Sequence, residues 1–235
     1  MKRITWILTA ASAFLLGWLF APGADAQPPA DTARFDQIVR NDFFAGFLGD
    51  KKALDRAMQI AEQTLAANPN HPEALAWHGA GLFARSGESF RAQDYAKGQE
   101  LWTQAIAEMD RAVLLAPDQV GVRIPRGAPL LMVSRFVPED RKKELLDRAK
   151  ADYLHAYKLQ ERSFEKLSLH SQGELLLGIA DALDRTEGFE QARPWIERAS
   201  SLGDKVYAGA AKRWLETGTL DPMSRTCKGC HVEGR

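Results

Sequence analysis

Cysteine is the scarcest residue in this sequence, because the 235 residues contain only two, Cys227 and Cys230. A disulfide between them would close a very short loop, and the stabilisation from a disulfide grows with the length of the loop that it closes. A structural zinc site needs four ligands, and the chain offers no second pair of cysteines. We therefore expect neither a disulfide framework nor a cysteine-based zinc fold.

Excess charge is also missing, because 31 lysines and arginines balance 31 aspartates and glutamates. Such a chain offers no electrostatic attraction to nucleic acid or to an anionic membrane surface. The sequence also lacks the fingerprints of a Ser/His/Asp triad, a phosphate-binding loop and a nucleotide-binding fold. We expect no nucleic-acid partner and none of these enzyme classes.

Long apolar stretches are missing except at the start of the chain. There, residues 4–20 are mostly apolar, follow two basic residues and precede an Ala-Asp-Ala sequence that ends at Ala26. This order is typical of a secretory signal peptide, so we predict that residues 1–26 are removed and that the mature protein is periplasmic, without a membrane span. An uncleaved membrane anchor is the alternative, because the stretch approaches the ~20 residues that cross a bilayer. No cysteine lies near the cleavage site, which argues against a lipid anchor.

The rest of the chain has a helical period. Apolar and small residues recur at three- and four-residue steps from Asp31 to Trp214, whereas the alternation typical of strands is almost absent. This period predicts an all-α fold. We expect an N-terminal segment over residues 27–49 with the first helix, a helical domain over residues 50–215 and a C-terminal segment over residues 216–235.

The clearest junction between two predicted helices lies at Asn68 and Pro69, where one helix ends before the next opens near Pro72. It resembles the junction between tetratricopeptide repeats, on the residues Asn68, Pro69, Asn70, Leu75, Gly79 and Leu82. In that family a glycine on the first helix of each pair lets the second helix approach closely. The resemblance implies a solenoid of antiparallel helix pairs.

A pattern of three residues, mostly small, with gaps of four and three, recurs on the second helix of each predicted pair. The last members of the copies lie 43 to 48 residues apart, further than the ~34 residues of the family's repeat, so we expect degenerate repeats with insertions. One candidate insertion is residues 86–99, between a helix ending near Arg85 and one starting near Gln99. The other is residues 116–140, whose four prolines argue against one continuous helix. The copies are Ala57/Ala61/Thr64, Ala105/Met109/Ala112, Ala149/Tyr153/Ala156 and Ala192/Ile196/Ala199.

The last nine residues, CKGCHVEGR, hold both cysteines, with His231 directly after the second. Cys-x-x-Cys-His is the signature for covalent attachment of a c-type haem, in which Cys227 and Cys230 form thioether bonds and His231 is the proximal ligand of the iron. Asp221 before Pro222 is typical of a helix start, which places the motif on a short terminal helix. A thioredoxin-like redox pair would need a strand before the first cysteine, and none is predicted.

The same segment resembles class II cytochromes c, the c-prime type, which carry their haem on the last helix of a bundle. Lys228 follows the first cysteine and Arg235 lies four residues after the histidine, as in that class, while Gly234 stands where an aromatic residue is usual. The resemblance implies that Lys228 and Arg235 lie near the haem and that the iron keeps an open sixth position.

A sixth ligand from the chain is the alternative to an open position. We favour Met132, because it follows a proline-rich segment that resembles the loops that deliver methionine in small cytochromes. The other candidates are His71, His78, His155, His170, Met109 and Met223.

Together these features predict an exported monohaem c-type cytochrome that transfers electrons, with a helical-repeat domain that docks a protein redox partner. The alternative is a non-redox scaffold of an envelope complex, in which the haem is structural or senses a gas. In both cases we expect one covalent haem c and no enzyme, with a peroxidase-like activity at an open haem as a further alternative.

Overall fold

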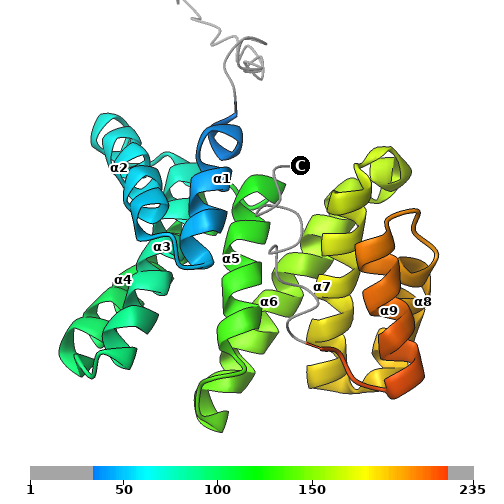
Figure 1. Ribbon diagram of the computed structural model, residues 1–235. Coiled ribbons are helices and arrows are strands. Elements are labelled where there is room, and N and C mark those ends of the chain that lie inside the picture. Colours follow the sequence, from blue (N-terminus) through cyan, green and yellow to red (C-terminus); the bar gives the residue numbers. More distant parts are fainter. Residues whose placement is uncertain (1–33, 222–235) are drawn as a thin grey trace, which may run out of the picture. The chain divides into compact units, whose positions relative to one another are not determined.

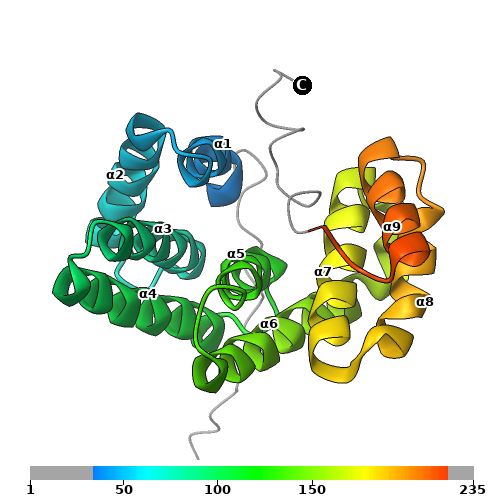
Figure 2. The same ribbon diagram turned by 60° about the horizontal axis from the view of Figure 1, so that its bottom comes forward.

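The computed structural model describes residues 34–221 of the chain. The predicted signal peptide and the Cys-x-x-Cys-His segment lie outside the described residues. Within residues 34–221 the chain forms helices and no strand, which confirms the all-α prediction (Figures 1 and 2). The elements are α1 (Phe35–Phe47), α2 (Lys51–Ala67), α3 (Pro72–Arg91), α4 (Tyr95–Leu115), α5 (Val120–Val133), α6 (Glu139–Gln160), the 3-10 helix η1 (Glu161–Lys166), α7 (Leu169–Glu187), α8 (Phe189–Ser200) and α9 (Lys205–Thr217).

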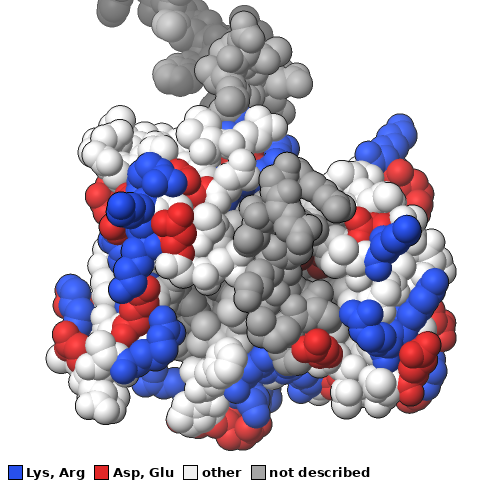
Figure 3. All heavy atoms as spheres, in the orientation of Figure 1, with Lys and Arg blue, Asp and Glu red and all other residues white. Residues whose placement is uncertain are grey.

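The surface of these helices carries both signs of charge. On the face drawn in Figure 3, lysine and arginine side chains are interspersed with aspartates and glutamates, as the balanced composition predicts. None of the helices between residues 34 and 221 is long and apolar enough to cross a membrane.

The junction between α2 and α3 lies where the sequence predicts it. α2 ends at Ala67 and α3 begins at Pro72. Proline suits the first helical position because the backbone N–H that it lacks would have no partner there. His71 caps the helix, since its Nδ1 accepts a hydrogen bond from the backbone N–H of Ala74 at 3.2 Å. The residue types of this turn therefore stop one helix and start the next.

The main contacts between helices follow the order of the chain. Each α-helix packs against the next one, with the most extensive contact between α3 and α4. The odd-numbered helices also contact one another in sequence, α1 with α3, α3 with α5, α5 with α7 and α7 with α9. Most of the core is therefore built between elements that are neighbours or next neighbours along the sequence.

The recurring pattern of small residues forms the packed face of α2, α4, α6 and α8. Eleven of its twelve residues are fully buried, and Thr64 at the end of α2 is the half-exposed exception. On the facing helix α3, Gly79 makes the close approach of α4 possible. A Cβ atom at Gly79 would lie 2.7 Å from Cγ of Met109 and 2.9 Å from the carbonyl oxygen of Ala105. No side chain fits between helices at this separation.

The first candidate insertion, residues 86–99, is not an irregular segment, so the predicted helix boundaries near Arg85 and Gln99 are wrong. α3 continues to Arg91 and α4 begins at Tyr95, with a three-residue turn between them. The longer helices are stabilised by packing between their added turns, where the Phe90 ring covers Gly98 so closely that a Cβ there would lie 2.6 Å from it. Most of residues 86–99 therefore lengthen α3 and α4 and do not form a separate loop.

The second candidate insertion, residues 116–140, is less irregular than expected, because it contains the helix α5. α5 runs without a break through Pro125 and Pro129. Each proline removes a backbone hydrogen bond, which ordinarily breaks an isolated helix. Here Pro125, Leu130 and Leu131 are buried in the core, and this packing outweighs the local preference. The segment as a whole is not one continuous helix, as its prolines predict, because α5 lies between Pro117 and Pro138, but Pro125 and Pro129 do not interrupt α5.

Two buried ionic contacts hold α5 against α6. Asp152 on α6 is fully buried and accepts hydrogen bonds from Nη1 of Arg123 at 2.9 Å and from Nε of Arg126 at 2.7 Å. Burial by itself lowers the pKa of Arg126, but the hydrogen bond and the charge of Asp152 outweigh it and raise the pKa above its ordinary value. Arg126 therefore stays charged inside the helix pair.

Candidate functional site

Five of the six predicted site residues belong to the terminal motif and lie outside the described residues: Cys227, Lys228, Cys230, His231 and Arg235. The described chain ends at Asp221, six residues before the first cysteine. Just before that end, Leu220 packs against the hydrophobic core. The described core thus reaches close in sequence to the motif, and it contains neither cysteine.

Met132, the sixth predicted site residue, lies in the last turn of α5. The proposed reason for choosing it is therefore wrong, because the prolines before it belong to a helix and form no loop. Its side chain is nevertheless 54% exposed, and Phe136, one turn further on, is 80% exposed. A thioether on the surface is a soft ligand that an iron atom brought from elsewhere can reach. Met109, in contrast, is fully buried between α4 and α3, so it is no candidate in this fold.

Two of the candidate histidines have roles inside the helical fold. His71 caps α3, as described above, and its ring nitrogen Nδ1 is engaged by the helix. His78 on α3 is buried, with Nδ1 at 2.5 Å from a carboxylate oxygen of Glu108 on α4 and Nε2 at 3.7 Å from Glu62 on α2. These contacts account for the positions of both histidines without a bound metal ion.

The other two histidines differ in the partners of their rings. His155 contacts the carboxylate of Asp118 through Nε2 at 2.8 Å. His170, on the first turn of α7, contacts the hydroxyl oxygen of Tyr207 on α9 through Nδ1 at 2.9 Å. Tyr207 packs so closely over Gly173 that a Cβ there would lie 2.2 Å from its ring. A ligating histidine usually has its second nitrogen oriented by a hydrogen-bond partner, and both rings have one, so His155 and His170 both stay candidates for an iron ligand.

Two buried tryptophan nitrogens add an observation about the end of the described chain. Among residues 34–221, Nε1 of Trp77 and Nε1 of Trp214 are buried and have no hydrogen-bond partner. A buried N–H donor without an acceptor is costly, so each such group needs an explanation. Trp214 is fully buried on α9, the last described helix. Its N–H needs an acceptor that the described residues do not supply.

The described residues hold no metal site of their own. No group of three histidine, cysteine, aspartate or glutamate side chains between residues 34 and 221 is placed to bind an ion. Comparisons with protein families, curated proteins and solved structures found no match to this chain.

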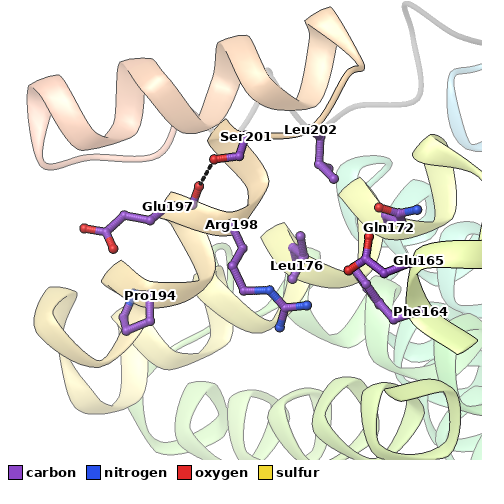
Figure 4. A pocket seen from close by; sticks show the side chains of 9 residues that line it. All are labelled: Phe164, Glu165, Gln172, Leu176, Pro194, Glu197, Arg198, Ser201 and Leu202. Atoms are coloured by element: carbon purple, nitrogen blue, oxygen red, sulfur yellow. Dashed lines mark hydrogen bonds between the residues drawn. The ribbon is translucent and has the colours of Figure 1, made fainter. Parts of the chain in front are cut away.

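Sequence reasoning missed one feature of the described helices, an open cavity of about 550 Å³ between η1, α7 and α8 (Figure 4). One of the charged residues that line it is Arg198 on α8, the helix that carries the last copy of the recurring pattern of small residues. No spacing in the sequence marks it, because the residues around the cavity come from three separate stretches of chain.

Proposed function

We propose that this protein is an exported monohaem c-type cytochrome that passes electrons to or from a protein partner in the periplasm. The single observation that carries the proposal is the Cys-x-x-Cys-His sequence at residues 227–231, which contains the only cysteines of the chain. The apolar leader that ends at Ala26 supports it, because haem c is attached to proteins outside the cytoplasm and the leader is typical of export.

The roles of the terminal residues follow from this proposal. A bound haem supplies a reversible one-electron change at its iron. Cys227 and Cys230 would hold the group covalently, and His231 would bind the iron. By the resemblance to class II cytochromes c, Lys228 and Arg235 would place positive charge near the haem, which favours its propionate groups. Met132, His155 or His170 would be the second iron ligand that the helical domain offers, or that position would stay open.

The helical domain is, in this proposal, a degenerate tetratricopeptide-like array that docks the redox partner. Three observations support it: the four copies of the buried pattern on α2, α4, α6 and α8, the sequential contacts between helices, and the glycine contact between Gly79 and Met109. Arrays of this kind present extended surfaces to partner proteins, which suits a carrier that must meet another protein briefly.

Production of the chain together with a cytochrome c maturation system tests the proposal. We expect a haem that stays with the polypeptide under denaturing conditions and that can be reduced and reoxidised. Alanine at Cys227 or Cys230 should impair attachment and alanine at His231 should remove the proximal ligand, while circular dichroism of the helical domain stays unchanged. A protein without covalent haem, or with haem that cannot be reduced, would contradict the proposal.

The absorption spectrum of the oxidised protein separates electron transfer from the scaffold alternative. A low-spin, six-coordinate iron favours electron transfer, and an open position favours gas binding. If the iron is six-coordinate, alanine variants of Met132, His155 and His170 can be compared, and only loss of the true ligand should change the spin state.

A further inference from the structure

The cavity between η1, α7 and α8 has an apolar wall and one cationic group. Phe164 of η1, Leu176 of α7 and Leu202 after α8 line it, and the side chain of Arg198 enters from α8 (Figure 4). Phe164 and Leu176 are buried, so this part of the wall belongs to the core. A volume of about 550 Å³ lies in the range of sites that hold small organic molecules.

Aromatic rings hold the guanidinium group of Arg198 in place. Its Cζ lies 4.9 Å from the centre of the Phe164 ring, 5.3 Å from that of Tyr157 and 5.7 Å from that of Trp195. Nη1 donates a hydrogen bond to the hydroxyl oxygen of Tyr157 at 2.8 Å. The rings of Tyr157 and Trp195 meet edge to face at 4.8 Å, so they form one packed cluster. The other N–H donors lie in the plane of the guanidinium and suit a carboxylate without further ordering of the side chain.

Arg198 has no carboxylate within ion-pair distance among residues 34–221. Arg193, earlier on the same helix, is paired with Glu190 at 2.8 Å, which shows the ordinary arrangement on α8. Glu165 and Glu197 also line the cavity. Figure 4 shows the Glu197 carboxylate turned away from the guanidinium and Glu165 reaching in from the η1 side. These two negative charges weaken the attraction of the cavity for any anion, and most of all for a ligand with more than one negative charge, so binding depends on the direct contact with Arg198.

We propose that this cavity binds a small monocarboxylate with an apolar body, the carboxylate on the guanidinium group of Arg198 and the apolar part against Phe164, Leu176 and Leu202. The proposal is independent of the haem, because every residue that it uses lies in the described helices. Its chemistry is that of a charge-assisted two-donor contact beside an apolar surface.

Titration with phenylacetate tests the site on the full mature protein. The Nε–H signal of Arg198 is followed by nuclear magnetic resonance, and phenylacetamide serves as a neutral probe of the same shape. We expect a saturable shift with phenylacetate and at least tenfold weaker binding of phenylacetamide. Equal binding of the two probes, or no shift with phenylacetate, would overturn the proposal.

Two variants of α8 provide the matched comparison. Arg198→Gln should weaken phenylacetate binding at least tenfold, whereas Arg193→Gln should leave it unchanged, because Arg193 does not line the cavity. Undiminished binding by a folded Arg198→Gln protein would also overturn the proposal. Should that variant fail to fold, Arg198→Lys keeps the positive charge without the planar fork, and we expect it to bind phenylacetate several-fold more weakly.

Discussion

The α3–α4 and α5–α6 pairs are built alike, as two consecutive helices joined by a short turn, but different interactions hold them together. α3 and α4 approach closely at Gly79, and their ring contact between Phe83 and Trp102 has centres 4.4 Å apart. α5 and α6 add ion pairs to Asp152, a carboxylate that is fully buried. The first pair thus depends mainly on the shape of its contact surfaces, beside the contact of His78 with Glu108, while the second has two arginines paired with one buried carboxylate. These ion pairs add to the apolar packing that keeps α5 helical although two prolines weaken its backbone hydrogen bonding.

The largest effect is expected at Asp152. Asp152→Asn removes the negative charge between Arg123 and Arg126, so Arg123 loses its carboxylate partner and Arg126 keeps only Asp110. We therefore expect the free energy of unfolding to fall by about 3 kcal/mol. Chemical denaturation measures it. The matched control is Asp147→Asn on the exposed side of α6, where Asp147 pairs with Lys143 at the surface and should cost below about 1 kcal/mol. Equal losses of unfolding free energy in the two variants would show that the buried ion pairs stabilise the α5–α6 pair no more than an ion pair at the surface does.

A smaller loss is expected at Gly79. Gly79→Ala places a methyl group against Met109 and the backbone of Ala105, and overpacking of this kind costs about 1 to 3 kcal/mol. Gly87→Ala on the same helix is the control, because its Cβ would meet only the flexible end of Arg91, at 3.4 Å. That control should gain up to about 1 kcal/mol from helix propensity. Thermal unfolding of both variants measures the difference, and a stabilising Gly79→Ala would contradict close packing of α3 on α4.

The smallest change in the free energy of unfolding is expected at Asp184 on α7. Burial, with a further contribution from the charge of Asp181, raises the pKa of Asp184 above its ordinary value. The ionised group therefore costs stability at neutral pH, and that cost disappears as the pH falls through its folded-state pKa. Asp184→Asn should stabilise the protein by less than about 1 kcal/mol at pH 7, since solvent screens this half-exposed group. Unfolding measured from pH 7 down to pH 3 should show the gain vanish, whereas a constant gain would contradict this assignment.

Prediction from the sequence succeeded where local residue types and packing agree. The all-α fold and the α2–α3 turn at Asn68 to Pro72 follow from periodicity and from proline at a helix start. It failed at residues 86–99 and 116–140, because helix length there depends on contacts across the fold. Phe90 packs on Gly98 only once α3 and α4 fold against each other, and Asp152 meets α5 from a position 26 residues beyond Arg126, so no helical period reveals either contact. For the site, the haem motif is readable from the sequence alone, whereas the reason for choosing Met132 was wrong because its segment is a helix.

The sequence by itself determined that the chain is helical, and it carries the local Cys-x-x-Cys-His signature on which the haem proposal depends. Both depend on spacing within a few residues, and such spacing is visible without a fold. Only the tertiary structure decided that α5 is continuous, that Met132 is exposed and that Arg198 lies among three aromatic rings. These features depend on burial and on contacts between helices that are far apart in the chain, and both arise only when the helices pack.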